Sequence, residues 1–140
     1  MLDARYMAGL FDGEGSIGIY SYYGDKLILR TQFTQNIYPE SRLLIKELKT
    51  RFGGNATPTR SLSGKWKFNW QLNSHKAAAF IRWIMPYLRF KRKEAEIALK
   101  WQNNRPKPSR NPKTGWFNPY PNRKSDHKVV IRLKKLKALR

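Results

Sequence analysis

The stretch that decides the fold runs from Tyr6 to Gly15 and reads Tyr6-Met7-Ala8-Gly9-Leu10-Phe11-Asp12-Gly13-Glu14-Gly15. It predicts a helix that begins after Asp3, because the Asp3 carboxylate can accept the free amide hydrogens of a first turn. The helix is expected to continue to about Asp12, and Gly13 and Gly15 are expected to end it. This helix is therefore rich in small residues and is followed closely by an acid.

Gly9 and Gly13 are four residues apart, so both lie on one face of the predicted helix. A face of small residues lets a second backbone approach closely, which suits pairing with another copy of the same helix. An ordinary core helix that stops at a glycine explains the same residues, and composition alone favours that simpler interpretation. The pattern leaves both interpretations open.

Glu14 is expected just past the helix end, where two paired helices would bring two such carboxylates together. Paired acids repel unless a cation lies between them, and hard oxygen ligands select magnesium or manganese over zinc. A metal ion at this place lowers the pKa of bound water and stabilises charge on a phosphodiester. For a lone glutamate after a helix, spacing alone favours simple solvent exposure.

The charge of the chain points to a polyanionic partner. The 140 residues carry 29 Lys and Arg against nine acids, a formal net charge of +20, far beyond what solubility requires. Nucleic acid is the first interpretation, and ribosome-like RNA binding or an anionic membrane surface are the others. No apolar run is long enough to span a bilayer, so we expect no membrane partner. We also expect no small-molecule substrate.

Other metal and redox chemistries are excluded by composition. The chain has no cysteine and two histidines, which rules out disulfides, thiolate zinc sites and a histidine-rich centre. Residues 1–5 show neither a signal peptide nor a transit sequence. We expect the protein to act in the compartment of its encoding genome, an organelle (chloroplast or mitochondrion) first and a bacterial or phage-infected cytoplasm second.

Hydrophobic periodicity predicts an α+β domain. Residues 15–23 and 27–35 alternate with period two around a turn at 23–25, which is typical of a β-hairpin. A second hairpin is expected around a turn that follows Arg60, with Trp66, Phe68 and Trp70 on its core face. Helices are expected from Pro39 to the glycines at 53–54, from a Ser74 cap to Pro86, and over 90–101.

The two predicted hairpins have one apolar face and one polar, aromatic and basic face. Alternation puts the apolar side chains of the first hairpin together, and these are Ile17, Ile19, Leu27, Leu29 and Phe33. The opposite face supplies most of our candidates for contacts with bases or phosphates. These are Ser16, Tyr20, Tyr22, Arg30, Gln32, Arg60, Lys65, Lys67 and Asn69. For each of them, plain surface exposure is the alternative.

The C-terminal third of the chain differs from the rest. Residues 104–124 hold five of the eight prolines and no acid, which excludes a helix or a central strand. We therefore divide the chain into a core at 1–103, a basic proline-rich arm at 104–125, and a basic amphipathic helix at 126–140. Lys113 and Lys124 are expected to hold phosphates, and the last helix is expected either to clasp DNA or to cap the fold.

The decisive stretch resembles the sequence motif of the LAGLIDADG homing endonucleases. The run MAGLFDGEG at 7–15 has Met7, Phe11, Gly13 and Glu14 in place of the first Leu, the Ile, the second Ala and the last Asp. Residues 33–35 (Phe-Thr-Gln) resemble the end of that family's second strand, and residues 86–93 resemble the basic segment after its third helix. The resemblance covers residues 1–103.

The resemblance implies an αββαββα core with an antiparallel four-stranded saddle sheet, and the hydrophobic pattern of the C-terminal third adds extra C-terminal helices that the resemblance does not cover. It further implies that Glu14 and the Gly13 carbonyl bind Mg²⁺, with Mn²⁺ as the alternative. By the same resemblance, Gln35 orients water molecules and Lys91 activates the nucleophile or stabilises the transition state. A dimer interface is implied at Ala8, Gly9, Asp12 and Gly13, with a structural role for Asp12 favoured over a catalytic one.

Because the chain holds one such motif and a cleaving unit needs two, the resemblance implies a homodimer on double-stranded DNA. The expected activity is cleavage of a long pseudo-palindromic target across the minor groove, leaving 3′ overhangs and promoting mobility of a host intron. The alternative is an intron RNA maturase or a DNA-binding regulator on the same scaffold, with intron RNA as its partner in the first case.

Overall fold

The structure is a computed structural model, and it describes residues 2–22, 26–105, 112–115 and 124–139. The predicted turn at 23–25 and most of the predicted arm, 106–111 and 116–123, lie outside the described residues. The elements, in chain order, are α1 (Ala4–Glu14), β1 (Gly15–Tyr22), β2 (Lys26–Asn36), α2 (Pro39–Phe52), β3 (Asn55–Arg60), β4 (Trp66–Asn73), α3 (Ser74–Ile84), the 3₁₀ turn η1 (Met85–Tyr87), α4 (Arg92–Asn103) and α5 (Lys124–Ala138).

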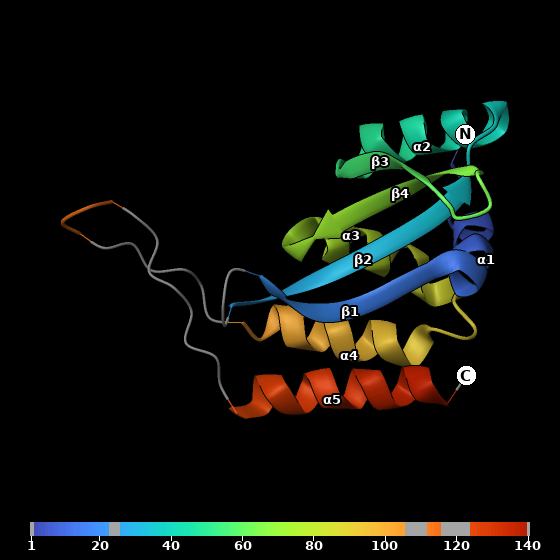
Figure 1. The fold of residues 1–140 in the computed structure, drawn as a ribbon. Coiled ribbons are helices and arrows are strands. Elements are labelled where there is room, and N and C mark those ends of the chain that lie inside the picture. Colours follow the sequence, from blue (N-terminus) through green and yellow to red (C-terminus); the bar gives the residue numbers. More distant parts are fainter. Residues whose placement is uncertain (1, 23–25, 106–111, 116–123, 140) are drawn as a thin grey trace.

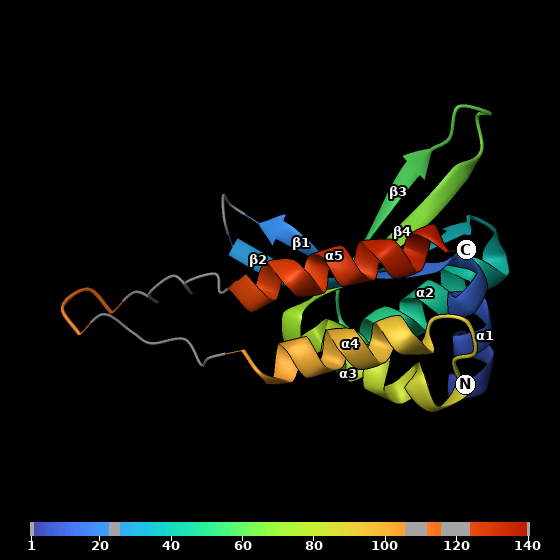
Figure 2. The same ribbon diagram turned by 90° about the horizontal axis from the view of Figure 1, so that it is seen from below.

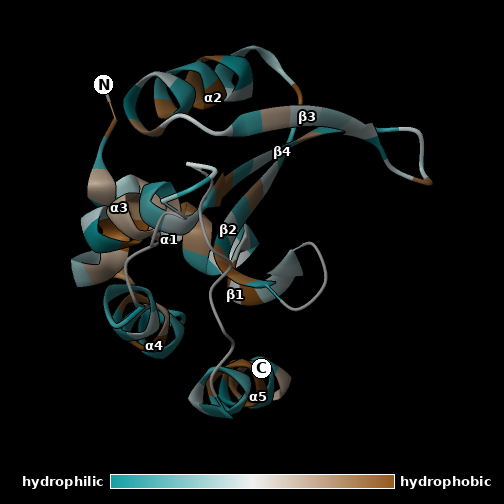
Figure 3. Ribbon diagram, turned by 90° about the vertical axis from the view of Figure 1, so that its left-hand side faces the viewer, coloured by the Kyte–Doolittle hydropathy of each residue, from teal (hydrophilic) through white to brown (hydrophobic). Residues whose placement is uncertain are grey.

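The four strands form one antiparallel sheet in the order β1-β2-β4-β3. The predicted α+β class, the αββαββα order and the four-stranded sheet are therefore confirmed. Figure 3 shows α1, α3 and α4 on one side of this sheet, and no helix of the described residues covers its other side. One face is thus packed and the other is open, as alternation of apolar and polar residues requires.

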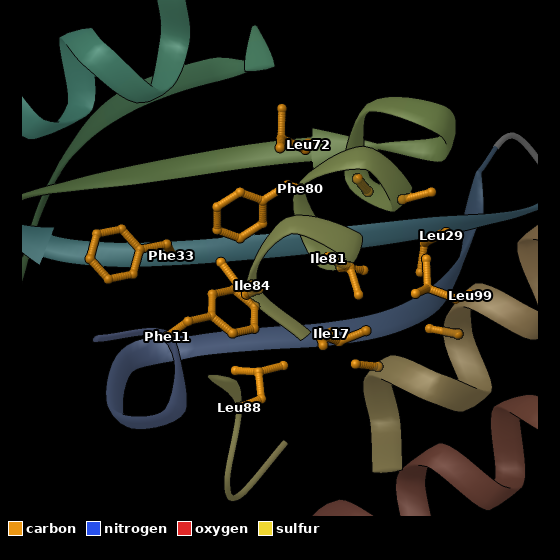
Figure 4. Packing of buried hydrophobic residues seen from close by; sticks show 14 of the residues in the cluster. Phe11, Ile17, Leu29, Phe33, Leu72, Phe80, Ile81, Ile84, Leu88 and Leu99 are labelled. Carbon is orange, nitrogen blue, oxygen red and sulfur yellow. The ribbon is translucent and has the colours of Figure 1, made fainter. Parts of the chain in front are cut away.

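The core lies between the sheet and the helices, and Phe80 of α3 is at its centre (Figure 4). The Phe80 ring makes edge-on contacts with Phe11, Phe52 and Trp70, at centroid distances of 5.6, 5.3 and 5.0 Å. Edge-to-face contacts of this kind are favourable, because the positive edge of one ring faces the negative face of the other. The Trp70 indole donates to the Gly53 carbonyl at 2.9 Å, so its polar atom is satisfied within the core. Through Phe80, Phe11 thereby connects the decisive stretch to the second hairpin.

Several predicted element boundaries are corrected. Helix α1 passes through Gly13 and ends at Glu14, because the backbone leaves the helical conformation only at the C-cap Gly15, which is extended and begins β1. The Asp3 cap is confirmed, since its carboxylate accepts from the amides of Arg5 and Tyr6. Helix α4 begins two residues later than predicted. Ser74 is not the cap of α3: Asn73 occupies that position, and Ser74 has a φ of 52°.

The outer end of the second hairpin was predicted wrongly. Trp66 has the same parity as Phe68 and Trp70, yet it is 52% exposed. Figure 2 shows the β3–β4 hairpin projecting beyond the helices, so no described helix covers its far end. Arg60 pairs with Trp66 and shares that parity, and Lys65 precedes β4 in the connecting turn. Arg60 and Lys65 were both predicted on the open face of the sheet, and neither lies there.

The C-terminal helix packs on the domain along α4 and the β1 edge of the sheet (Figure 1). Leu133 is buried there, and the Trp101 indole of α4 donates to the Asp126 carboxylate at 2.9 Å in a buried contact. Helix α5 begins at Lys124, so this lysine belongs to the helix and not to the arm. Within the described residues, no helix has both the length and the apolar character needed to cross a bilayer.

Candidate active site and nucleic-acid interface

The C-terminal end of α1 is fixed by Asp12. Its carboxylate accepts hydrogen bonds from three consecutive backbone amides that precede α4, those of Arg89 (2.8 Å), Phe90 (3.2 Å) and Lys91 (3.1 Å). Successive amides that converge in this way form a concave anion site, which here is filled by a side chain of the same chain. Asp12 therefore joins the decisive helix to the basic segment at 89–91, which is remote in sequence.

Lys91 lies beside the same helix end. Its ammonium group donates to the main-chain carbonyl of Asp12, one of the carbonyls that the helix itself leaves without a partner. Lys91 is half-buried, and it lines a cavity together with Gly15, Ser16, Glu94 and Lys137. The structure thus brings a lysine to within one helical turn of Glu14, as an active site at this helix end requires.

Glu94 and Lys137 belong to this cavity and were not singled out in the sequence. Glu94 is only 2% exposed although it lies in the most basic part of the chain. A carboxylate is rarely buried to this degree unless cations surround it. The sequence signal was an acid three residues after Lys91, on the same helical face. Nothing in the sequence indicated that Lys137 belongs to this cavity, because α5 brings it there from a distant part of the chain.

Glu14 is the last residue of α1 and is exposed. The carbonyl oxygens at a helix end point along the axis and carry partial negative charge. The Phe11 carbonyl accepts from Gly15, the Asp12 carbonyl accepts from Lys91, and the Gly13 carbonyl is the next in the series. A carboxylate beside such carbonyls offers the hard oxygen donors that Mg²⁺ prefers.

One protomer alone falls short of a metal centre. No group of three or more Asp, Glu, His or Cys side chains comes together anywhere in the described ranges. The Asp12 carboxylate already holds three amides, which leaves Glu14 as the carboxylate that this helix end presents. The donor type fits a hard divalent cation, and a single carboxylate does not fill the coordination shell of such an ion.

The glycine face of α1 is open. A Cβ atom built at Gly9 or at Gly13 would meet nothing within 4 Å, so the protomer itself does not need a glycine at either position. Both glycines lie inside the helix, where each costs roughly 1 kcal/mol relative to alanine. Ala8 is different: it is fully buried against the core, and its assignment to a dimer interface was wrong. Ala8 follows the Met7 and Phe11 side of the helix.

Gln35 does not line the cavity formed by Lys91, Glu94 and Lys137 at the end of α1. It is opposite Phe68 in the sheet register, on the helix-covered face, and its amide donates to the Tyr38 hydroxyl at 2.7 Å. It lines a separate cavity between α1 and α2 whose other residues include Tyr6, Leu10 and Glu47. The structure therefore joins Asp12, Glu14 and Lys91 but leaves Gln35 in a different setting.

The open face of the sheet carries the predicted polar residues. The register places Ser16, Tyr20, Tyr22, Arg30, Gln32, Lys67 and Asn69 on this face. The same parity adds residues that the sequence reasoning did not select, namely Gly18, Lys26, Ile28, Thr34, Asn36, Asn55, Thr57, Thr59, Gln71 and Asn73. The described strand residues of this face include no acid. Lys113 and Lys124 are exposed and belong to no strand.

Comparison with known proteins was negative at the level of sequence and positive at the level of structure. No protein-family model and no curated protein matches the sequence. The homing endonuclease I-CvuI, solved with its target in the presence of calcium, superimposes with a TM-score of 0.58 at 17% identity. The match covers 98% of this chain and 81% of that one. The chain has the LAGLIDADG homing-endonuclease fold.

Two further structures match the LAGLIDADG fold of this chain. The LAGLIDADG homing endonuclease I-GzeII, in complex with a DNA target, matches with a TM-score of 0.54 at 24% identity, over 74% of this chain and 36% of that chain. The meganuclease I-SmaMI, bound to uncleavable DNA, matches with a TM-score of 0.54 at 19% identity, over 97% of this chain and 44% of that chain. The matches to I-CvuI and I-SmaMI extend beyond residue 103, where the sequence resemblance stopped.

Asp12→Ala is expected to lower the free energy of unfolding by about 1–3 kcal/mol, because three amides lose a charged acceptor. Asp12→Asn keeps one acceptor oxygen and should lose less than half of that. Urea unfolding of the wild type and both variants measures the difference. An Asp12→Ala protein as stable as the wild type would show that the contact between α1 and residues 89–91 contributes nothing to folding.

Proposed function

We propose that this protein is a homodimeric, divalent-metal-dependent, site-specific endonuclease of double-stranded DNA. The observation that carries the proposal is the end of α1, where Glu14 is exposed, Lys91 donates to the Asp12 carbonyl, and the glycine face is open. The fold supports the proposal, because similar structures were solved as homing endonucleases with DNA.

The homodimer follows from the glycine face. Helix-interior glycines at positions 9 and 13 cost stability in the protomer, and no other described element occupies the room that they leave. A second copy of α1 crossing at this face would use that room, because two backbones can approach closely where no Cβ intervenes. Such a crossing would put the two helix ends side by side and extend the two open sheet faces into one longer surface.

The metal site follows from the dimer. Two Glu14 carboxylates and the Gly13 carbonyls would hold Mg²⁺, or Mn²⁺, at the twofold axis, where the two acids would otherwise repel. When bound, the ion supplies Lewis-acid stabilisation of the phosphodiester and a more acidic water. Lys91 holds its positive charge beside the same helix end, where it would stabilise the pentavalent transition state. Asp12 serves by fixing the position of Lys91. For Gln35 we propose a water-orienting role that requires its amide to leave the Tyr38 hydroxyl.

The DNA surface follows from charge and shape. The net charge of +20 favours a polyanion, and the open face offers amides, hydroxyls and cations without a described acid. Strands can enter the major groove, where each base pair presents a distinct pattern of donors and acceptors. The exposed Lys113, Lys124, Arg60 and Lys65 lie off this face and are proposed to hold phosphates, which carry no sequence information.

Incubation of the protein with a randomised duplex pool and Mg²⁺, followed by sequencing of cleaved ends, tests the proposal. We expect cleaved sites that are pseudo-palindromic, with short 3′ overhangs, and no cleavage when EDTA replaces Mg²⁺. A symmetric site is required because a twofold protein presents the same surface to each half-site. Binding to DNA or intron RNA without cleavage of any pool member would instead identify a binding protein on this scaffold.

A further inference from the structure

Arg30 lies at the middle of the open face of the sheet. It belongs to β2, an inner strand, and the register puts it opposite Gly18 of β1 and Asn73 of β4. A Cβ atom at Gly18 would lie 2.6 Å from the Tyr20 ring, so the ring occupies the space that this glycine leaves. The missing side chain at position 18 therefore lets the Tyr20 ring lie along β1 over Gly18, next to Arg30 on the neighbouring strand.

The Arg30 side chain is held from two sides. Its Nε atom donates to the Asn73 side-chain oxygen at 3.1 Å, and its guanidinium carbon lies 5.6 Å from the centre of the Tyr20 ring. Lys137 of α5 lies over the same ring at 5.6 Å, and its ammonium lies 3.4 Å from the Tyr20 hydroxyl. A chain of contacts thus crosses the open face from α5 through β1 and β2 to β4.

Asn73 shows that this arrangement is specific. It occupies the N-cap position of α3, where an asparagine side chain ordinarily accepts from the first turn of the helix. Its side chain makes no such bond and instead accepts from Arg30. The next residue, Ser74, takes up a φ of 52°, which a non-glycine residue adopts only at a cost. The contact with Arg30 is therefore formed in preference to the ordinary cap.

We propose that Arg30 reads a guanine in the major groove and that Asn73 is its positioning residue. With Nε engaged by Asn73, the two terminal nitrogens of the guanidinium remain as a pair of parallel donors. This end-on pair matches the O6 and N7 acceptors of guanine, the commonest specific contact of arginine with DNA. Because the side chain is already oriented, less rotamer entropy is lost on binding than for a mobile arginine.

This inference rests on the proposed function only in taking double-stranded DNA as the partner, and it does not need cleavage. The competing role for Arg30 is a phosphate contact, which fixes position without reading sequence. The two roles differ in one measurable respect. Loss of a phosphate contact weakens all sequences alike, whereas loss of a guanine contact removes discrimination at one position of each half-site.

The test selects bound sequences from a randomised duplex pool in the presence of Ca²⁺, with fluorescence anisotropy on the selected duplex and its single-position variants. We expect the wild type to fix a G·C pair at one position of each half-site, with at least about tenfold preference. Arg30→Ala and Arg30→Lys should reduce that preference to within about twofold, with all other positions unchanged. Asn73→Ala should give an intermediate value, because the guanidinium is present but no longer held.

Arg42→Ala is the matched control. Arg42 is exposed on α2, away from the open face, so this variant loses the same charge but should keep the guanine preference. Thermal unfolding of each variant checks folding, and Arg30→Lys keeps the charge and the stem if Arg30→Ala is unstable. Equal weakening of all sequences by Arg30→Ala, or relaxation at a pair other than G·C, would overturn the proposal. An Asn73→Ala protein with wild-type discrimination would overturn the positioning role. Failure of Mg²⁺-dependent cleavage would affect the proposed function alone.

Discussion

Glu14→Gln is expected to reduce the single-turnover rate of DNA cleavage by at least roughly 10²- to 10³-fold, the loss typical when one preorganised charge-stabilising group is removed. Glutamine keeps the size and one oxygen of the side chain but loses the negative charge that would hold a divalent cation. In a homodimer both copies change, so both halves of the proposed metal site are affected. Rates measured at saturating protein with Mg²⁺ isolate the chemical step.

DNA affinity provides the necessary second measurement for Glu14→Gln. We expect affinity to be unchanged or slightly higher, because the substitution removes a negative charge that would face phosphates in the proposed complex. Glu96→Gln is the control. Glu96 is exposed on α4 and pairs with Arg92 at 3.4 Å, so the Glu96→Gln protein should cleave DNA at the wild-type rate. Cleavage by Glu14→Gln at the wild-type rate would refute the proposed metal site.

Gly9→Leu is expected to weaken the dimer without destabilising the folded protomer. Leucine favours a helix over glycine by about 0.8 kcal/mol, and a Cβ atom at this position meets no other described element within 4 Å, so the folded monomer should not be destabilised. Across the proposed helix pair, two inserted side chains cost about 2–6 kcal/mol, which weakens the dimer at least roughly 30-fold. DNA cleavage should fall with dimerisation.

Sedimentation equilibrium at micromolar protein measures the Gly9→Leu effect. The wild type should sediment at twice 16.6 kDa, and the variant should approach 16.6 kDa. Ala79→Leu is the control, because Ala79 is an exposed small residue on α3 and its substitution should leave the dimer intact. A Gly9→Leu protein that remains dimeric would place the dimer interface somewhere other than the glycine face of α1.

Local sequence patterns were sufficient for most of the architecture. The α+β class, the two hairpins and the assignment of Ile17, Leu29 and Phe33 to the packed face follow from periodicity, which reports burial directly. The Asp3 cap and the stop of α2 at Gly53 follow from backbone chemistry within a few residues. Trp66 was misassigned because periodicity gives the face of a strand but not how far the helix layer extends along it.

The sequence by itself determined which residues could carry the chemistry: one acid at the end of a glycine-faced helix, a basic segment after η1, and a polar sheet face. Only the tertiary structure decided how they combine. In the folded chain the Asp12 carboxylate accepts from the amides at 89–91, and the Asn73 side chain accepts from Arg30. Ala8 is buried in the core, and the Gln35 amide donates to the Tyr38 hydroxyl. The physical reason is that the hydrogen bonds of Asp12 and Asn73 are directional and join residues tens of positions apart, while the burial of Ala8 depends on which elements pack against α1.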